Sequence, residues 1–191
     1  MIVWLVRHGE PAWPAGAALG WSDPVLTPAG EAQASAAADR LASRPLSAVH
    51  SSDLRRSLLT ARRVAARHGL RVSVTSELRE LHFGPWEGRS LADLWAEDPD
   101  AARAWESDLE RTPPQFGESV ADLRRRVGSF ARRLAAGPGE VAVVAHRGSL
   151  AALQSALTGV EFATCWTLGF ALGEVREVRP VQRNGGRPCS R

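Results

Sequence analysis

Short apolar runs alternate with longer amphipathic stretches along the chain. Residues 2–6 form a continuous apolar run that ends at a polar turn, and residues 141–145 form a second. Continuous runs of this length are typical of parallel strands that are buried on both faces. Residues 48–50 and 72–74 predict two further short strands, and residues 166–178 are expected to contribute two more.

Helices are predicted between these strands. Thr27 and Pro28 open a helix to about residue 44, because Thr caps a helix N-terminus and Pro suits its first turn. Residues 51–53 precede a helix that ends near residue 69, and residues 149–157 form another. This alternation predicts an α/β fold, a three-layer sandwich in which helices cover both faces of a mostly parallel sheet.

The clearest helix is predicted over residues 118–135. Its apolar residues recur at steps of three and four, which places them on one stripe. They are Val120, Leu123, Val127, Phe130 and Leu134. The arginines at positions 124–126 and 132–133 lie among acidic residues outside this stripe, so we interpret them as a solvated face.

Residues 86–116 differ from the rest of the chain because they are rich in Trp and interrupted by Pro. We expect a helical insertion here, lying over one end of the sheet. A chain of 191 residues otherwise fits one domain. The predicted organisation is therefore a single domain over residues 1–182, followed by a disordered tail over residues 183–191.

Composition narrows the class of protein. The hydrophobic share of 44% supports a sizeable core, and no apolar run approaches the ~20 residues of a membrane span. The N-terminus lacks the features of a secretory signal, and two cysteines make neither a disulfide framework nor a zinc motif. A cytoplasmic protein with no membrane partner is expected. The formal net charge is only +3, so nucleic acid is not expected as a partner either.

Candidate chemistry follows the two apolar runs. Arg7, His8 and Gly9 come after the first run, and His146 and Arg147 come after the second. Ligands bind beyond the carboxyl ends of the strands in sheets of this class. Two histidines at two such ends can face one another across one pocket, and the neighbouring arginines indicate a site for an anion.

The segment 5–10, L-V-R-H-G-E, resembles the signature of the histidine phosphatase superfamily, which includes the cofactor-dependent phosphoglycerate mutases. Further motifs that resemble this family follow in order at residues 23–33 (D-x-x-L-T-x-x-G-x-x-Q), 52–61, 78–88, 117–119 and 146. The resemblance covers residues 2–158 and implies a phosphoglycerate mutase-like fold.

The resemblance also implies roles for individual residues. His8 would be the nucleophile that takes the phosphoryl group, because an unprotonated imidazole held in line attacks phosphorus readily. Arg7 and Arg56 would bind the phosphate, since a guanidinium forks onto two oxygens. His146 would be the second catalytic histidine and would also contact the phosphoryl group. Glu80 matches the proton donor for the leaving group.

Other residues are candidates for lining the substrate pocket: Glu10, Ser22, His82, Glu118 and Arg147. Glu118 is equally plausible as an acid at a helix N-terminus, and His82 is at least as plausible as a packing residue. Arg55 resembles Arg56 in sequence but is expected at the surface.

Two positions depart from the family pattern. Pro14 follows Trp13 where the family commonly has an Asn that contacts phosphate, and Arg147 replaces a small residue after the second histidine. Pro14 is expected to remove one phosphate contact. Arg147 either adds a charge to the pocket or points away from it.

The expected function is hydrolysis of a small phosphorylated metabolite, with no cofactor and no metal. Within the superfamily the resemblance is closest to the α-ribazole-5′-phosphate phosphatases of cobalamin nucleotide-loop synthesis, which makes α-ribazole 5′-phosphate the candidate substrate. The alternatives are a phosphoglycerate mutase, which the short chain disfavours, and a non-catalytic protein that binds a phosphorylated ligand. Residues 166–178 are a candidate edge for a homodimer.

Overall fold

The computed structural model describes residues 1–114 and 116–181 and contains one five-stranded sheet in the order β3-β2-β4-β1-β5. The strands are β1 (Ile2–Arg7), β2 (Leu46–Ser52), β3 (Val72–Thr75), β4 (Glu140–Ala145) and β5 (Val175–Val178). The first four pair in parallel with one another, and β5 pairs antiparallel with β1. The mostly parallel sheet predicted from the sequence is confirmed.

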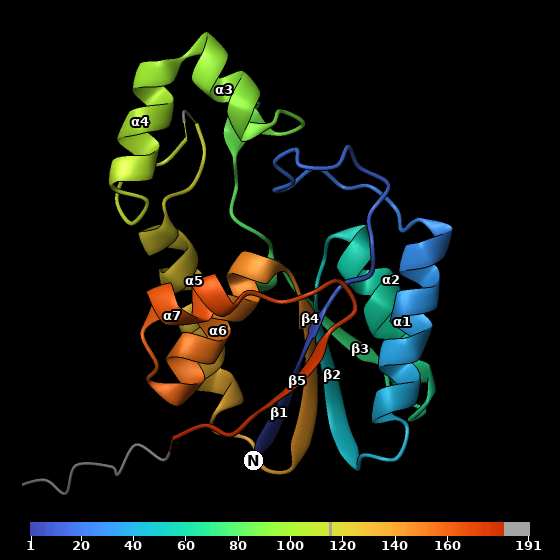
Figure 1. Ribbon diagram of the computed structural model, residues 1–191. Coiled ribbons are helices and arrows are strands. Elements are labelled where there is room, and N and C mark those ends of the chain that lie inside the picture. The colour runs from blue at the N-terminus through green and yellow to red at the C-terminus, as the bar shows by residue number, and fades with distance from the viewer. Residues whose placement is uncertain (115, 182–191) are drawn as a thin grey trace, which may run out of the picture.

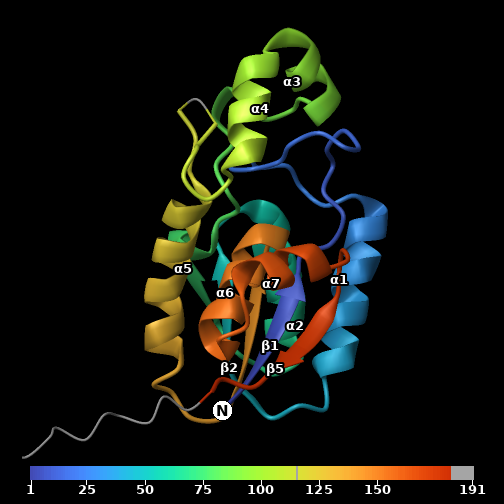
Figure 2. The ribbon, with the colours of Figure 1, turned by 60° about the vertical axis from the view of Figure 1, so that its left-hand side comes forward.

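Helices cover both faces of this sheet (Figures 1 and 2). On one face lie α1 (Pro28–Leu41) and α2 (Arg55–Ala66), and on the other lie α5 (Val120–Leu134) and α6 (Arg147–Thr158). Alternate residues of β1 divide between the two cores. Trp4 and Val6 belong to the core beneath α1 and α2, whereas Val3 and Leu5 pack with α5 and α6. Because β1 is buried on both faces, its sequence is continuously apolar.

Local signals set the beginnings of the helices. The Thr27 hydroxyl accepts a hydrogen bond from Gly30 N at 3.0 Å, and Pro28 is the first residue of α1, as predicted. Helix α5 begins after Ser119, whose side chain forms a capping box with Asp122. All five residues of the predicted apolar stripe of α5 are buried.

The segment that follows β3 leads to the far end of the molecule. It contains two short 3₁₀ helices, η1 (Ser76–Leu78) and η2 (Gly84–Trp86), and then α3 (Leu91–Glu97) and α4 (Pro99–Ser107). Helices α3 and α4 stand beyond the carboxyl ends of the parallel strands (Figure 1). The ring of Trp105 contacts Trp86 with centroids 5.5 Å apart, which ties α4 to η2. No helix among the described residues is long and apolar enough to cross a membrane.

Two expectations are corrected. Residues 166–178 contribute one strand, β5, rather than two, because Trp166 belongs to α7 (Phe162–Leu168). Phe162 and Trp166 lie one turn apart with ring centroids 5.6 Å apart, a contact that favours a helix. The arginines at 124–126 are not all solvated either, since the side chain of Arg126 is only 18% exposed. The expected tail over residues 183–191 lies outside the described residues.

Candidate active site

The two histidines identified in the sequence lie side by side. Strands β1 and β4 are adjacent and in register from Ile2 to Arg7, so that Arg7 pairs with Ala145. His8 and His146 therefore emerge at the same edge of the sheet, with ring centroids 5.0 Å apart and ring planes inclined by 59°. Both side chains are buried.

The hydrogen bond made by His8 defines its tautomer. Its Nδ1 lies 2.7 Å from the carbonyl oxygen of Gly9. A carbonyl oxygen can only accept, so Nδ1 carries the proton and Nε2 holds a free electron pair. Burial, and then the charge of Arg56, hold the pKa of His8 well below its usual value. The ring is therefore neutral at pH 7, with a nucleophilic Nε2.

His146 has the opposite tautomer. Arg56 Nε donates to His146 Nδ1 at 3.2 Å. A guanidinium has no acceptor, so Nδ1 is unprotonated and Nε2 carries the hydrogen. Burial, followed by the charge of Arg56, holds the pKa of His146 well below its usual value. The pair thus presents one nitrogen electron pair and one N–H donor.

Arg56 is fixed in the floor of the site by the first turn of α2. Besides His146, its guanidinium donates to the carbonyl oxygens of Ser22 at 2.8 Å and Gly20 at 2.7 Å. Burial lowers the pKa of Arg56 to about 10, so the group stays charged at neutral pH. These bonds use three of its five N–H groups and leave two for a ligand. Arg55 is exposed, as expected.

Two buried donor atoms at the histidine pair, one from Arg7 and one from His146, have no acceptor among the described residues. Arg7 donates from Nη1 to the carbonyl oxygen of Phe170 at 2.6 Å. Within residues 1–114 and 116–181, neither Arg7 Nε nor His146 Nε2 has a hydrogen-bond partner, although both atoms are buried. Buried donors without acceptors are costly in a folded protein unless a ligand satisfies them. An anion would satisfy both.

Close backbone packing holds the loop that carries His8. A Cβ atom at Gly9 would lie 2.1 Å from the carbonyl oxygen of Gly30, so no larger residue fits between β1 and α1. Gly9 N also donates to the hydroxyl of Thr60 at 3.2 Å. The residue after His8 is therefore held between α1 and α2, which fixes the position of His8 at the end of β1.

Glu80 reaches the same site from the segment after η1. Its Oε2 accepts from Gly148 N at 3.0 Å, and its Oε1 accepts from Leu81 N at 2.9 Å. Gly148 lies in the first turn of α6, so the carboxyl group of Glu80 lies at the N-terminus of this helix. Burial lowers the pKa of both Arg7 and Arg56. The charge of Glu80 raises the pKa of each arginine in part, because Glu80 lies near both guanidinium groups.

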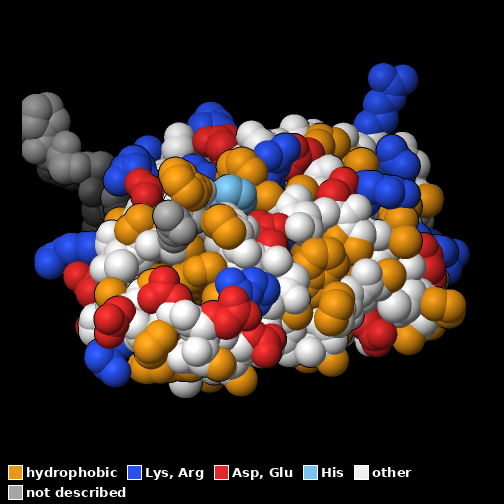
Figure 3. All heavy atoms as spheres, turned by 90° about the horizontal axis from the view of Figure 1, so that it is seen from above, with side chains coloured by type: hydrophobic (Ala, Val, Ile, Leu, Met, Phe, Trp, Pro, Cys, Tyr) orange, Lys and Arg blue, Asp and Glu red, His pale blue; other side chains and the backbone are white. Residues whose placement is uncertain are grey.

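Ser22 and His82 lie close to this site, because the carbonyl oxygen of Ser22 accepts from Arg56 and His82 follows Glu80 by two residues. Ser22 N donates to a carboxylate oxygen of Glu87 at 2.6 Å. The ring of His82 packs against Trp21 with centroids 4.6 Å apart. Viewed from above, this face exposes a histidine among hydrophobic side chains, with both signs of charge close by (Figure 3).

Glu10 and Glu118 differ in their surroundings. Glu10 is partly buried, and its backbone N–H donates to Gln33 at 2.8 Å. The carboxylate of Glu118 forms an ion pair with Arg126. Glu118 also precedes the helix cap, so the acid in the first turn of α5 is Asp122 instead.

Arg147 points toward α7. Its guanidinium lies over the ring of Trp166, 5.5 Å from the centroid, and its Nη2 donates to the Trp166 carbonyl oxygen at 3.3 Å. The side chain of Arg147 is exposed. Burial is the main cause of the lowered pKa of Arg7, and the charge of Arg147 lowers that pKa further. Arg147 thus contributes positive potential at the rim. Pro14 is exposed in the loop before α1.

Three groups that support the site are not among the residues predicted from the sequence. These are the Thr60 hydroxyl, the Phe170 carbonyl oxygen and the side chain of Arg126. Each acts through a contact between distant parts of the chain, which no local pattern signals. Among the described residues, no group of three or more His, Cys, Asp or Glu side chains is arranged to hold a metal ion.

Several known proteins are similar to this chain. Glucosyl-3-phosphoglycerate phosphatase from Mycolicibacterium vanbaalenii is 39% identical over 166 residues, covering 82% of this chain and 73% of the relative. Adenosylcobalamin/α-ribazole phosphatase from Salmonella typhimurium is 36% identical over 169 residues, covering 87% and 84%. The crystal structure of the α-ribazole phosphatase from Shigella flexneri superposes with a TM-score of 0.87 at 31% identity, covering 95% of this chain and 92% of that chain.

The family assignment rests on most of the chain. The profile of the histidine phosphatase superfamily (branch 1) matches residues 3–187. This match includes both strand ends that carry the histidines and the segment that carries Glu80. The protein is a phosphatase that belongs to the histidine phosphatase superfamily.

Proposed function

We propose that the protein hydrolyses a small phosphate monoester through a phosphohistidine at His8, without a metal ion. The observation that carries this proposal is the complementary pair of tautomers. His8 offers the electron pair of a neutral imidazole, and His146 offers an N–H group that no described residue accepts. One ring can attack phosphorus while the other donates to a phosphoryl oxygen.

In the first step His8 Nε2 forms a bond to phosphorus, and the bond from phosphorus to the ester oxygen breaks. Charge spreads over the phosphoryl oxygens in the transition state, where donors held in place stabilise it. Arg7, Arg56 and His146 supply these donors. The departing alkoxide takes a proton from Glu80, which would contribute about 10²–10⁴-fold to the rate.

In the second step a water oxygen forms a bond to phosphorus, and the bond to His8 Nε2 breaks. Glu80, now a carboxylate, accepts the proton of the water. Inorganic phosphate leaves, and both residues return to their starting states. All of the chemistry is carried out by side chains of this chain.

α-Ribazole 5′-phosphate is the first candidate substrate. Both the Salmonella relative and the Shigella structure bear the name of that activity. The leaving group is a bulky nucleoside, and the aromatic side chains of Trp21 and His82, next to Glu80, offer a surface on which such a group can stack.

Glucosyl-3-phosphoglycerate is the second candidate, and Arg147 favours it. This compound carries a carboxylate close to its phosphate, whereas α-ribazole 5′-phosphate does not. An exposed guanidinium beside the phosphate site would attract that additional negative charge. The Mycolicibacterium relative bears the name of the corresponding activity.

The test is phosphate release, measured in EDTA, from a panel of monoesters. The panel contains both candidate substrates, phosphoserine, 3-phosphoglycerate and p-nitrophenyl phosphate. We expect turnover by the wild type, one ester preferred by orders of magnitude, and no turnover by His8→Ala. Release that requires added 2,3-bisphosphoglycerate would indicate a mutase. Phosphate binding without turnover would indicate the non-catalytic alternative.

Arg147→Gln distinguishes the two candidate substrates. Loss of one partly solvated charge contact costs about 1 kcal/mol, which corresponds to about a fivefold fall in kcat/KM. We expect this fall for glucosyl-3-phosphoglycerate and no change for α-ribazole 5′-phosphate. Arg125→Gln, an exposed arginine on α5, is the matched control. An equal effect on both esters would contradict a role in charge recognition.

A further inference from the structure

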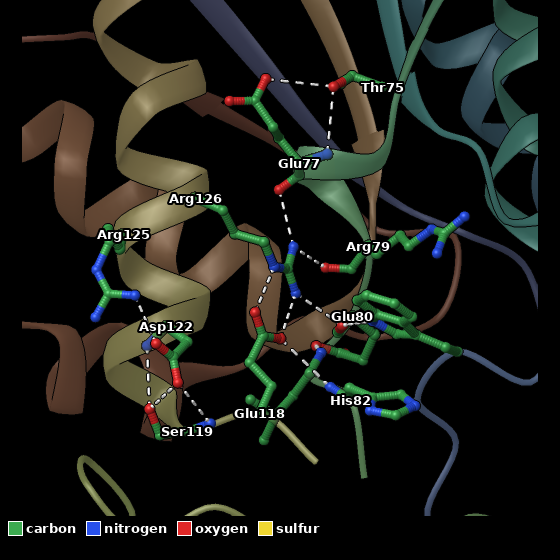
Figure 4. A network of polar contacts seen from close by, with 12 residues as sticks. Thr75, Glu77, Arg79, Glu80, His82, Glu118, Ser119, Asp122, Arg125 and Arg126 are labelled. Atoms are coloured by element: carbon green, nitrogen blue, oxygen red, sulfur yellow. Dashed lines mark hydrogen bonds and ion pairs between the residues drawn. The ribbon is translucent and has the colours of Figure 1, made fainter. Parts of the chain in front are cut away.

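The side chain of Arg126 crosses from α5 to the segment that carries Glu80. Its guanidinium donates to the carbonyl oxygens of Glu77 at 2.9 Å, Arg79 at 2.7 Å and Glu80 at 2.8 Å (Figure 4). The guanidinium of Arg126 therefore binds the backbone both within η1 and directly after it. The carbonyl of Glu80 itself is among its acceptors.

Glu118 completes this arrangement. Its Oε1 and Oε2 accept from Nε and Nη2 of Arg126, each at 2.7 Å. Its Oε2 also lies 3.4 Å from the backbone N of His82, which donates to it. The Arg126–Glu118 pair, meaning these two side chains, thus binds the chain both at Glu80 and two residues beyond it. The side chains are only 18% and 13% exposed, so water competes weakly for these bonds.

Arg126 has no capacity left for a substrate. It makes five hydrogen bonds, and a guanidinium has five N–H groups. The charge is also balanced by Glu118. Its effect on the reaction must therefore be indirect, through the backbone that it holds.

Two further contacts hold Glu80, one at its carboxylate and one at its backbone carbonyl. Its carboxylate accepts from Gly148 N, and its carbonyl oxygen accepts a second bond from Trp21 Nε1 at 2.8 Å. The carboxylate can keep its place beside α6 only if the backbone beneath it does not move. Catalysis is sensitive to displacements of about 1 Å in such groups.

We propose that Arg126 is a positioning residue that fixes Glu80 for proton transfer to the leaving group, with Glu118 as its partner. This inference rests on the proposed role of Glu80. It also explains why an arginine that belongs by sequence to a solvated face turns inward. Arg126→Lys preserves the charge but supplies three donors instead of five, and it loses the planar fork.

The test compares two leaving groups. An alkyl ester needs a proton when its alkoxide departs, whereas the weakly basic phenolate of p-nitrophenyl phosphate does not. We expect Arg126→Lys to lower kcat/KM for an alkyl monoester by about 10- to 100-fold, within the range of acid catalysis. For p-nitrophenyl phosphate we expect a change of less than about threefold, because that reaction makes little use of a general acid.

Three variants accompany this measurement. Glu80→Gln should give the same selective loss, and adding Arg126→Lys to it should cause little further loss, because both act on one step. Arg125→Lys, next in sequence and exposed, should leave both rates unchanged. Glu118→Gln should give a smaller loss of the same selectivity, and it replaces Arg126→Lys if that variant does not fold.

Each outcome decides the proposal. Selective loss in Arg126→Lys or Glu118→Gln supports it, and equal losses on the two esters, or none, overturn it. If Glu80→Gln is selective and the other two variants are not, only the positioning role fails. If Glu80→Gln is itself not selective, the proton-donor role fails and the positioning role fails with it.

Discussion

The floor of the site and the insertion above it are held by different kinds of contact. The floor consists of β1 and β4, paired in register and buried on both faces. The insertion consists of α3 and α4, whose caps and ion pairs are largely exposed. Buried, hydrogen-bonded segments open rarely, whereas segments with exposed bonds open locally at low free energy. We therefore expect the chemistry to take place in the rigid region and the leaving group to be recognised in part by the more adaptable one.

The largest expected effect comes from breaking the floor. His8→Asn removes the nucleophile and should lower kcat/KM by at least about 10⁴-fold on every ester, as loss of a nucleophile does in other covalent enzymes. Phosphoprotein stable to alkali should be trapped in the wild type and not in the variant. His68→Asn, two residues beyond the end of α2, is the control. Retained turnover in His8→Asn would refute the covalent mechanism.

The next effect concerns the contact between Gly148 and Glu80. A Cβ atom at Gly148 would lie 2.4 Å from Glu80 Oε1, so Gly148→Ala must displace the carboxylate. We expect kcat/KM for alkyl esters to fall by about 10- to 100-fold, within the contribution of a general acid. Gly128→Ala in α5 meets only an Arg132 nitrogen at 3.8 Å and should be neutral or slightly stabilising. Similar kinetics for the two variants would show that the glycine contact is dispensable.

A smaller and more selective effect is expected in the insertion. Trp105→Ala removes the aromatic contact with Trp86 that ties α4 to η2. KM for a bulky ester should rise about three- to tenfold, since one buried aromatic contact is worth about 0.5–1.5 kcal/mol. The kcat for p-nitrophenyl phosphate should not change, and amide hydrogen exchange should accelerate in α4. A fall in kcat on both esters would mean that the two regions are not separable.

The sequence predicts the floor well because its signals are local. Apolar runs specify β1 and β4, and the residues that follow them lie at one sheet edge by topology alone, so His8 and His146 could be paired in advance. The contacts of Arg126 could not be predicted, because a helical repeat shows which positions of the helix are polar but not which distant segment their side chains contact. The sequence predicts a strand at Trp166, which lies in a helix, because a short apolar stretch without clear periodicity suits a strand or a helix equally.

The last effect is on stability in acid rather than on the rate. Burial lowers the pKa of His8 and of His146 below 6.5, so the unfolded chain binds more protons than the folded one just below pH 6.5. The free energy of unfolding should be unaffected by these groups above about pH 7 and should fall from pH 6.5 toward pH 5. Each group contributes at most about 1.4 kcal/mol per pH unit.

Urea denaturation at pH 7 and pH 5 measures this effect. The loss of stability between the two pH values should be smaller in His8→Asn than in the wild type, because one buried histidine is gone. Arg62→Gln, at an exposed position of α2, leaves every histidine in place and should lose as much as the wild type. An equal loss in all three proteins would mean that the buried pair does not resist protonation.

The contact between Gly9 and Gly30 bears on any attempt to redesign this enzyme. Because the two backbones touch, neither position accepts diversity, and a combinatorial library that included them would consist mostly of unfolded members. Randomisation restricted to the exposed surface of α3 and α4 leaves that contact intact. Activity on esters with new leaving groups can therefore be sought by varying α3 and α4, while the residues for phosphoryl transfer stay unchanged.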